Sequence, residues 1–323
     1  MALLEAHGER TLTLPDVSVV IPCRNEAENV ETITTAVAHE LGELGVDYEI
    51  IIIDNASTDD TVPISKGLCA SDHRIRLIVN NRDYGQMRSP THGIYQASGR
   101  AVIGMCADFQ DPPALLREFV VRWRAGAQIV LGVRRTEKGS IVRRTLRNAG
   151  YAFFRTFGDY PVIPGATGFG LYDRRVIDCL AHWHEPEPFF RGMLVESGFR
   201  LETVSYDRPP RAAGTSNNNL QSLVGFAISS VTACSKRLLR LPLYFAAILL
   251  IGSFATGILA LETIIVRRDV IPDACLALGE FAFAWVFFFL GLLGDQVRVV
   301  SERTRQTPLV IEKERVNFPE TAR

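Results

Sequence analysis

The chain has 323 residues, which is enough for one large domain and an appended segment. Its formal net charge is −1, so it lacks the overall basic field that draws proteins to nucleic acid. The cysteines form no Cys-x-x-Cys pair, which argues against a zinc site and indicates reduced thiols in a reducing compartment; they are Cys23, Cys69, Cys106, Cys179, Cys234 and Cys275.

Short apolar runs rich in valine and isoleucine alternate with helical patterns in the first half of the chain. The predicted strands are Val17–Ile21, Glu49–Ile53, Arg76–Val79, Ala101–Met105 and Ile129–Gly132. The predicted helices run from Ala27 to about Leu44 with Asn25 and Glu28 as a cap, from Ser89–Pro90 onward, and over Pro113–Ala125. This alternation predicts a mostly parallel, doubly wound α/β sheet.

Polar residues follow three of these strands directly. In doubly wound sheets, ligands bind beyond the carboxyl ends of the strands, so these residues are the candidates for a site. The three clusters are Arg24-Asn25-Glu26, Asp54-Asn55-Ala56-Ser57 and Asp108-Phe109-Gln110-Asp111.

Asp54 ends the second predicted strand. A carboxylate at a strand tip can accept hydrogen bonds from a nucleobase or a ribose. A plain Asx turn that closes the strand is the alternative, and the residue alone does not decide between the two.

Asp108 and Gln110 place a carboxylate and an amide oxygen two residues apart. Such oxygens suit a hard divalent cation that keeps several waters and bridges to substrate phosphates. The alternative is a loop that caps a helix, since Asp111 precedes two prolines.

Two uncharged stretches near the C-terminus, Leu241–Leu261 and Phe281–Gly294, predict a membrane hairpin. About 20 apolar helical residues span a bilayer, and the second stretch reaches that length only if residues 274–280 are included. We therefore expect residues 241–296 to form two spans, at about 241–266 and 274–294. An amphipathic juxtamembrane segment, 217–240, precedes them, and a tail, 297–323, follows. Two buried core helices are the alternative.

The charges beside the hairpin predict its orientation. Six cations flank its outer ends and two lie in its link, which places both ends in the cytosol. The first fifteen residues also show no apolar signal region. We expect a multi-pass protein of the inner (plasma) membrane with membrane lipid as a partner and a cytosolic catalytic domain, 1–216. The cations are Lys236, Arg237, Arg240, Arg298, Arg303 and Arg305 at the ends, and Arg267 and Arg268 in the link.

The order of the motifs resembles the inverting, nucleotide-sugar-dependent glycosyltransferases of the GT-A fold. The glutamine in the metal motif and the hairpin resemble the polyprenyl-phosphate branch, which includes dolichyl-phosphate mannose synthases and bactoprenol glucosyltransferases. Resemblance covers about residues 16–310. The matching segments are Val19–Glu26, Ile53–Asp59, Gly85–Pro90, Ala107–Pro113, Gly168–Arg174, Phe190–Gly192, Tyr206–Arg208 leading to Arg211 and Ser216, and Leu290–Gln296.

The resemblance implies transfer of a hexose, in the first instance glucose from UDP-glucose, to polyprenyl phosphate with inversion. The partners would be a UDP- or GDP-hexose, polyprenyl phosphate and further copies of this chain. A divalent cation, Mg²⁺ or Mn²⁺, would be held by Asp108 and Gln110. The chain departs from the pattern at Asn55 and Cys106, where many relatives have acids.

The same resemblance implies roles for single residues. The donor would be bound by residues of the first three motifs and their neighbours. Because the acceptor phosphate is already anionic, catalysis would come from positioning and from neutralising the leaving diphosphate. Arg191 and Arg211 would clamp phosphate, unless they belong to a salt-bridged face, and Asp111 would orient the sugar or the acceptor. The expected donor residues are Pro22, Arg24, Glu26, Asp54, Ser57, Arg88, Asp108 and Ser216; the expected catalytic ones are Asp108, Asp111, Arg191 and Arg211.

Two other functions fit parts of the sequence. A processive polysaccharide synthase is disfavoured because Arg122-Trp123 lacks the glutamine of the Gln-x-x-Arg-Trp acceptor motif. A non-catalytic pseudo-glycosyltransferase scaffold is supported by Asn55 and Cys106, and opposed by the presence of Asp108, Gln110, Arg191 and Arg211.

Overall fold

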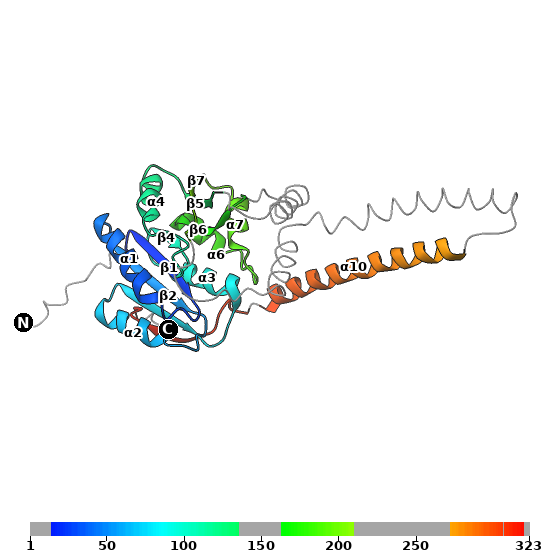
Figure 1. Ribbon diagram of the computed structural model, residues 1–323, viewed down its shortest axis with the longest axis horizontal. Coiled ribbons are helices and arrows are strands. Elements are labelled where there is room, and N and C mark those ends of the chain that lie inside the picture. Colours follow the sequence, from blue (N-terminus) through cyan, green and yellow to red (C-terminus); the bar gives the residue numbers. More distant parts are fainter. Residues whose placement is uncertain (1–13, 136–162, 210–271, 306, 320–323) are drawn as a thin grey trace, which may run out of the picture.

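Among the described residues, eight strands form one sheet in the order β7-β5-β6-β4-β1-β2-β3-β8. The computed structural model describes residues 14–135, 163–209, 272–305 and 307–319. Four of the seven pairings between described strands are parallel, which confirms the mostly parallel α/β sheet (Figure 1). The strands are β1 Val17–Cys23, β2 Tyr48–Asp54, β3 Ile75–Asn80, β4 Ala101–Gly104, β5 Ile129–Arg134, β6 Ala166–Asp173, β7 Leu201–Tyr206 and β8 Glu312–Val316.

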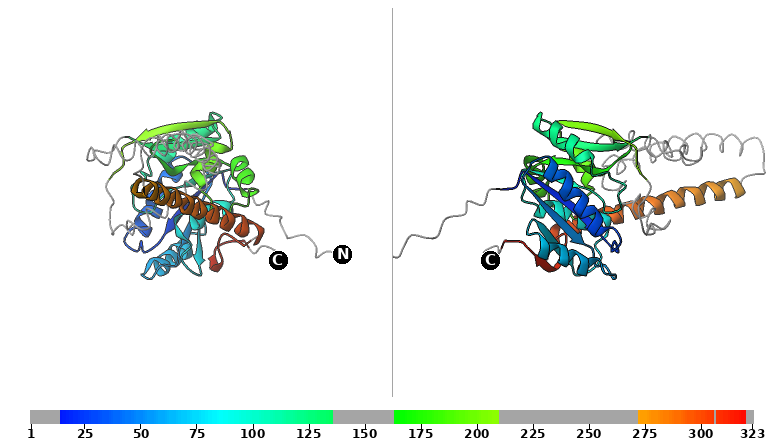
Figure 2. Two further views of the ribbon diagram at one scale, coloured as in Figure 1. Left: turned by 90° about the vertical axis from the view of Figure 1, so that its right-hand side faces the viewer. Right: turned by 60° about the vertical axis from the view of Figure 1, so that its left-hand side comes forward.

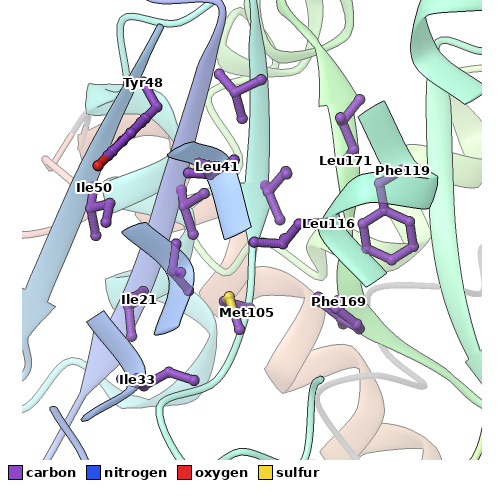
Figure 3. Packing of buried hydrophobic residues seen from close by; sticks show 14 of the residues in the cluster. Ile21, Ile33, Leu41, Tyr48, Ile50, Met105, Leu116, Phe119, Phe169 and Leu171 are labelled. Carbon is purple, nitrogen blue, oxygen red and sulfur yellow. The ribbon is translucent and has the colours of Figure 1, made fainter. Parts of the chain in front are cut away.

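Helices cover both faces of the sheet. The central strands β1 and β2 are buried on both sides, which explains their nearly continuous runs of valine and isoleucine. Helices α1 (Val30–Glu43), α2 (Thr61–Ser71) and α4 (Leu115–Arg124) pack on one face, whose core is seen in Figure 3. Helices α3 (Gly85–Gln96), α6 (Arg174–Ala181) and α7 (Phe190–Glu196) pack on the other.

The direction of the chain changes between β1 and β4. From β1 the chain adds β2 and then β3 on one side, and it returns to add β4 on the other side of β1. At such a switch point the loops that follow the two strands diverge and leave a crevice at their carboxyl ends. The polar residues that follow β1 and β4 lie at this switch point.

Two predicted helix starts are wrong. Helix α1 begins at Val30 with Asn29 as its N-cap, because Asn25 adopts a left-handed conformation (φ 55°) and its side chain binds the backbone of Thr58. Helix α3 begins at Gly85, so Pro90 lies inside the helix and does not open it. At α1 the contact of Asn25 with Thr58, 33 residues further along the chain, overrides the local signal.

The strands β6, β7 and β8 were not predicted. Strand β8 lies in the segment that the sequence suggested as a tail, yet it pairs antiparallel with β3 at the edge of the sheet. Its sequence, Glu-Lys-Glu-Arg-Val, is charged because an edge strand faces water on one side. Charged residues without an apolar alternation give no strand signal.

The predicted membrane hairpin is not borne out. The segment 217–240 and the first span, about 241–266, lie outside the described residues, and the second span falls within α10 (Pro272–Arg305), which extends from the α/β domain (Figure 2). Among the described residues no helix is long and apolar enough to cross a membrane. Glu280 interrupts the apolar run and Asp295 ends it, which leaves Phe281–Gly294, shorter than the about 20 residues required. The prediction of a multi-pass inner-membrane protein is therefore contradicted.

Candidate functional site

The loops after β1 and β2 are bound to each other at the carboxyl end of the sheet. The Asn25 backbone N–H donates to Ser57 Oγ at 2.9 Å, and the Thr58 N–H donates to Asn25 Oδ1 at 2.8 Å. The Glu26 N–H donates to Thr61 Oγ1 at 2.9 Å. These bonds give the two loops one fixed geometry, and Asp54 is tied to the same arrangement through the Ser57 N–H.

Asp54 is the last residue of β2 and its exposed fraction is 0%. Its Oδ2 accepts a hydrogen bond from the Ser57 N–H at 3.0 Å, whereas its buried Oδ1 has no partner among the described residues. Burial raises the pKa of this carboxyl, although the hydrogen bonds from Ser57 act in the opposite direction. A buried carboxylate with one unused oxygen is suited to accept a hydrogen bond from a ligand.

Asn55 occupies a position that requires an amide. Its Nδ2 donates to Asp83 Oδ1 at 2.6 Å, and its Oδ1 accepts from the Tyr84 N–H at 2.9 Å and from Asn80 Nδ2 at 3.2 Å. A carboxylate at position 55 could not donate to Asp83. Asp83 also forms an ion pair with Arg24, so this acid, which is not among the predicted site residues, belongs to the candidate site.

The predicted metal motif forms a tight turn after β4. Phe109 has a φ of 60°, and the Gln110 N–H donates to Asp108 Oδ1 at 3.2 Å. Gln110 Oε1 accepts a hydrogen bond from the Arg208 guanidinium. The part of the chain that the structure describes contains no group of three or more His, Cys, Asp or Glu side chains able to hold a metal. Two oxygen ligands from Asp108 and Gln110 nevertheless fit a hard cation that takes its other ligands from phosphates and water.

Asp111 fixes the metal motif to the neighbouring strands. It is 2% exposed; its Oδ1 accepts from the Tyr206 hydroxyl at 2.9 Å and its Oδ2 from the Cys106 N–H at 3.0 Å. Burial raises the pKa of Asp111, while nearby Arg134 lowers it. Burial and the adjacent Asp111 raise the pKa of Tyr206 to about 12. Asp111 therefore anchors the loop to its surroundings. The segment Tyr206–Arg208 was singled out by resemblance, but the contact between Tyr206 and Asp111 was not predicted.

Two of the described arginines lie beside the predicted metal motif, and the predicted clamp Arg191 makes its contacts elsewhere. Arg134 ends β5 and interacts with Asp111 and Tyr206, and Arg208 binds Gln110. Arg191 donates to the Ala166 carbonyl at 3.4 Å and lies over the Phe189 ring. Arg134 was missed because an arginine at a strand end carries no signal of its own. The predicted clamp Arg211 and the predicted donor residue Ser216 lie outside the described residues.

The other predicted donor residues divide into two groups. Pro22 lies within β1, and Arg24, Glu26, Asp54 and Ser57 gather around the ends of β1 and β2. The remaining one, Arg88, is bound elsewhere: its Nε donates to the Leu309 carbonyl at 2.9 Å and its terminal nitrogen to the Pro308 carbonyl at 3.0 Å. The structure thus places Arg88 against the C-terminal segment.

Comparisons of the sequence agree with this arrangement. Residues 18–180 match the family model described as glycosyl transferase family 2. An uncharacterized glycosyltransferase, sll0501, from Synechocystis sp. is 30% identical, over 92% of this chain and 94% of that protein. The putative glycosyltransferase CsbB of Bacillus subtilis is 28% identical, over 94% of this chain and 92% of that protein. An undecaprenyl-phosphate 4-deoxy-4-formamido-L-arabinose transferase of Klebsiella pneumoniae is 28% identical, over 96% and 98%.

Solved structures show a weaker similarity. A mannosyltransferase from Pyrobaculum calidifontis, in complex with GDP-mannose and Mn²⁺, covers 91% of this chain and 88% of its own, with 16% identity and a TM-score of 0.42. A mannosyl-3-phosphoglycerate synthase from Rubrobacter xylanophilus covers 80% and 78%, with 17% identity and a TM-score of 0.48. These TM-scores are too low to support an assignment of ligand, so the family assignment is based on the sequence matches.

Proposed function

The chain belongs to glycosyl transferase family 2, and on this basis we propose that it transfers a hexose from a nucleotide-sugar to polyprenyl phosphate with inversion. It is a glycosyltransferase, and UDP-glucose is the first candidate donor. The product would be a sugar joined to the polyprenyl chain through one phosphate.

The observation that carries the donor assignment is the unused buried oxygen of Asp54. Uracil and guanine both have ring N–H groups that can donate a hydrogen bond to a carboxylate, and the hydroxyl groups of ribose can do the same. A hydrogen bond to an ionised acceptor contributes about 1.5–3 kcal/mol of stabilisation. It would therefore offset part of the free-energy cost of burying Asp54. The nucleoside would therefore lie over the ends of β1 and β2.

Asp108 and Gln110 are the residues that would hold a divalent cation, and their oxygen ligands fit Mg²⁺ or Mn²⁺. When bound, such an ion neutralises charge on the diphosphate leaving group. The chain itself contributes Arg208, whose guanidinium already contacts Gln110, and Arg134 beside Asp111. Guanidinium groups match phosphate oxygens in geometry and charge, so both are suited to the leaving group.

The acceptor proposal is supported by the relatives. The Klebsiella protein that matches this chain over nearly its whole length is named for transfer to undecaprenyl phosphate. In a single displacement, an acceptor phosphate oxygen forms a bond to the anomeric carbon while the bond to the nucleoside diphosphate breaks, which inverts that carbon. The nucleophile is already anionic near neutral pH, so no strongly tuned base is required. Arg191 and Arg211 are the proposed clamps on the acceptor phosphate.

The structure weakens the case for a non-catalytic scaffold. Asn55 and Cys106 were the support for that alternative, because each stands where many relatives have an acid; the structure bears on Asn55. The amide has a specific task, since it donates to Asp83 while it accepts from Tyr84, so the replacement does not mark a decayed site.

The test is an incubation of the purified full chain with polyprenyl phosphate, Mg²⁺ or Mn²⁺, and a panel of radiolabelled UDP- and GDP-sugars. Label should enter the lipid extract from one donor of the panel and should not enter it in the presence of EDTA. The absence of label with every donor, from protein that binds nucleotide, would contradict the proposed acceptor.

A further inference from the structure

The chain returns to the sheet after α10. Residues 307–317, here called the return segment, include β8, which pairs antiparallel with β3 from Leu77 opposite Val316 to Asn80 opposite Glu312. Val310 in this segment is 4% exposed, so the segment is packed into the domain and is not a loose end. The carboxyl end of β3, beside which it lies, is next to the end of β2 where Asp54 is located.

The return segment is bound to the loop that follows β3. The Ile311 N–H donates to the Tyr84 hydroxyl at 3.1 Å, and the Asn81 N–H donates to the Ile311 carbonyl at 3.1 Å. The Tyr84 hydroxyl in turn donates to Asn81 Oδ1 at 2.8 Å. Arg88 adds its two hydrogen bonds to the carbonyls of Pro308 and Leu309. The Tyr84 hydroxyl is thus shared between the return segment and the loop.

The other side of the same loop faces the donor residues. The Tyr84 backbone N–H donates to Asn55 Oδ1 at 2.9 Å, and Asn55 Nδ2 donates to Asp83 Oδ1 at 2.6 Å. Asp83 pairs through its second oxygen with Arg24. Tyr84, which is 8% exposed, therefore connects Ile311 on one side with the residue next to Asp54 on the other.

We propose that Tyr84 is a positioning residue of the donor site, through which the return segment holds Asn55, Asp83 and Arg24 in place for the nucleotide. The inference rests on the proposed function in one respect, that a nucleotide binds at Asp54. Groups that are already held in the binding geometry lose less conformational entropy when a ligand arrives. Loss of the tyrosine hydroxyl leaves the ring in place but removes the hydrogen bond from the Ile311 N–H and the bond to Asn81 Oδ1, so the loop is held less firmly and nucleotide binding weakens.

The experiment compares the full chain with its Tyr84→Phe variant by calorimetric titration with UDP and with GDP in the presence of Mg²⁺. The dissociation constant of the nucleotide that binds should rise about fivefold, the factor that corresponds to one net hydrogen bond. In steady state with the active donor, KM should rise by a similar factor while kcat changes little, because Tyr84 does not touch the reacting atoms.

The matched control is Asn317→Gly, which loosens the far end of the same segment. Asn317 Nδ2 donates to the carbonyls of Cys69 at 2.7 Å and of Ile75 at 2.8 Å, and its φ of 61° is one that glycine adopts freely. This variant should lower Tm and leave the nucleotide dissociation constant unchanged.

Three results would overturn the inference. An unchanged dissociation constant in Tyr84→Phe would show that the hydroxyl positions nothing. An equal rise in Tyr84→Phe and Asn317→Gly would show a general loss of stability in place of positioning. If the unaltered chain binds neither UDP nor GDP, the proposed function fails first and the inference fails with it, which separates that outcome from the other two.

Discussion

The side-chain amide of Asn55 donates a 2.6 Å hydrogen bond to the carboxylate of Asp83, across the gap between the loops that follow β2 and β3. The Asn55 amide can take only one orientation, because its nitrogen donates to Asp83 while its oxygen accepts a hydrogen bond from the Tyr84 N–H. The single carboxylate of the pair is then free to bind Arg24 through its second oxygen. One carboxylate and one amide can therefore make all of these contacts, whereas two carboxylates could not.

The first prediction exchanges the two groups. Asn55→Asp places two carboxylates at hydrogen-bonding distance, and urea unfolding should show a loss of about 1–3 kcal/mol, within the range for a buried polar group that loses its partner. Adding Asp83→Asn restores one amide and one acid, so the double variant should regain part of this loss. The double variant should not regain all of the lost stability. In the unaltered protein the Gly85 N–H donates to Asp83 Oδ1 at 2.8 Å, and this N–H would lose its acceptor when an amide nitrogen takes the place of that oxygen. A single variant as stable as the unaltered protein would contradict the account.

The second prediction concerns Asp54 and pH. Burial raises the pKa of Asp54 above its value in the unfolded chain, so the ionised carboxylate opposes folding. This penalty is complete above the folded pKa and disappears as the pH falls below the unfolded pKa of about 4. Asp54→Asn should therefore raise Tm at pH 8, and the gain should shrink toward pH 4.

The same variant should bind nucleotide at least about tenfold more weakly, because the ligand loses an ionised acceptor. Tm measurements across pH and titration calorimetry check the two halves of the prediction. A variant that is less stable at pH 8 and binds nucleotide normally would return Asp54 to the role of a turn residue.

The third prediction separates Asp108 from the fold. Asp108 is half-buried, and its Oδ1 accepts a 3.2 Å hydrogen bond from the Gln110 N–H, which an asparagine oxygen can also accept. Asp108→Asn should remove most transferase activity and leave Tm nearly unchanged. Titration with Mn²⁺ and nucleotide should show weaker metal binding. Full activity of the variant would contradict the assignment of Asp108 as a metal ligand.

The fourth prediction treats Asp111 as an anchor. Tyr206→Phe removes the hydroxyl that donates to Asp111 Oδ1 and leaves a buried carboxylate oxygen short of a donor. The free energy of unfolding should fall by about 1–3 kcal/mol. Activity should fall along with it, since the metal motif loses its support. Unfolding by urea provides the measurement, and an unchanged midpoint would show that Asp111 does not depend on Tyr206.

Much of the first half of the fold could be predicted because its signals are local. Runs such as Ile50–Ile53 are fully buried, as such β-branched apolar runs indicate for interior strands. Asp54 ends β2 and Asp108 comes shortly after β4, and the ends of these strands lie at one edge of the sheet. The helix starts were wrong where a residue distant in sequence decides the conformation, as Thr58 does for Asn25.

The missed parts of the site depend on contacts between distant segments. The place of Asp83 in the site follows only from its contacts with Asn55 and Arg24, and the place of Tyr206 follows only from its contact with Asp111. The role of Arg88 depends on Pro308 and Leu309, which lie 220 and 221 residues further along the chain. Strand β8 was not predicted because its residues are charged. The membrane hairpin was predicted from apolar length alone, and no helix among the described residues is long and apolar enough to bear it out.

The most direct test of the central claim is the anomeric configuration of the sugar in the product. Polyprenyl phosphate and UDP-glucose, or whichever donor the panel identifies, are incubated with the full chain, and the lipid product is purified for NMR. The coupling between the anomeric carbon and its hydrogen distinguishes the two configurations. An α-linked donor should give a β-linked sugar phosphate, as a single displacement requires. An α-linked product, or nucleoside diphosphate and free sugar without any sugar–lipid, would contradict the account.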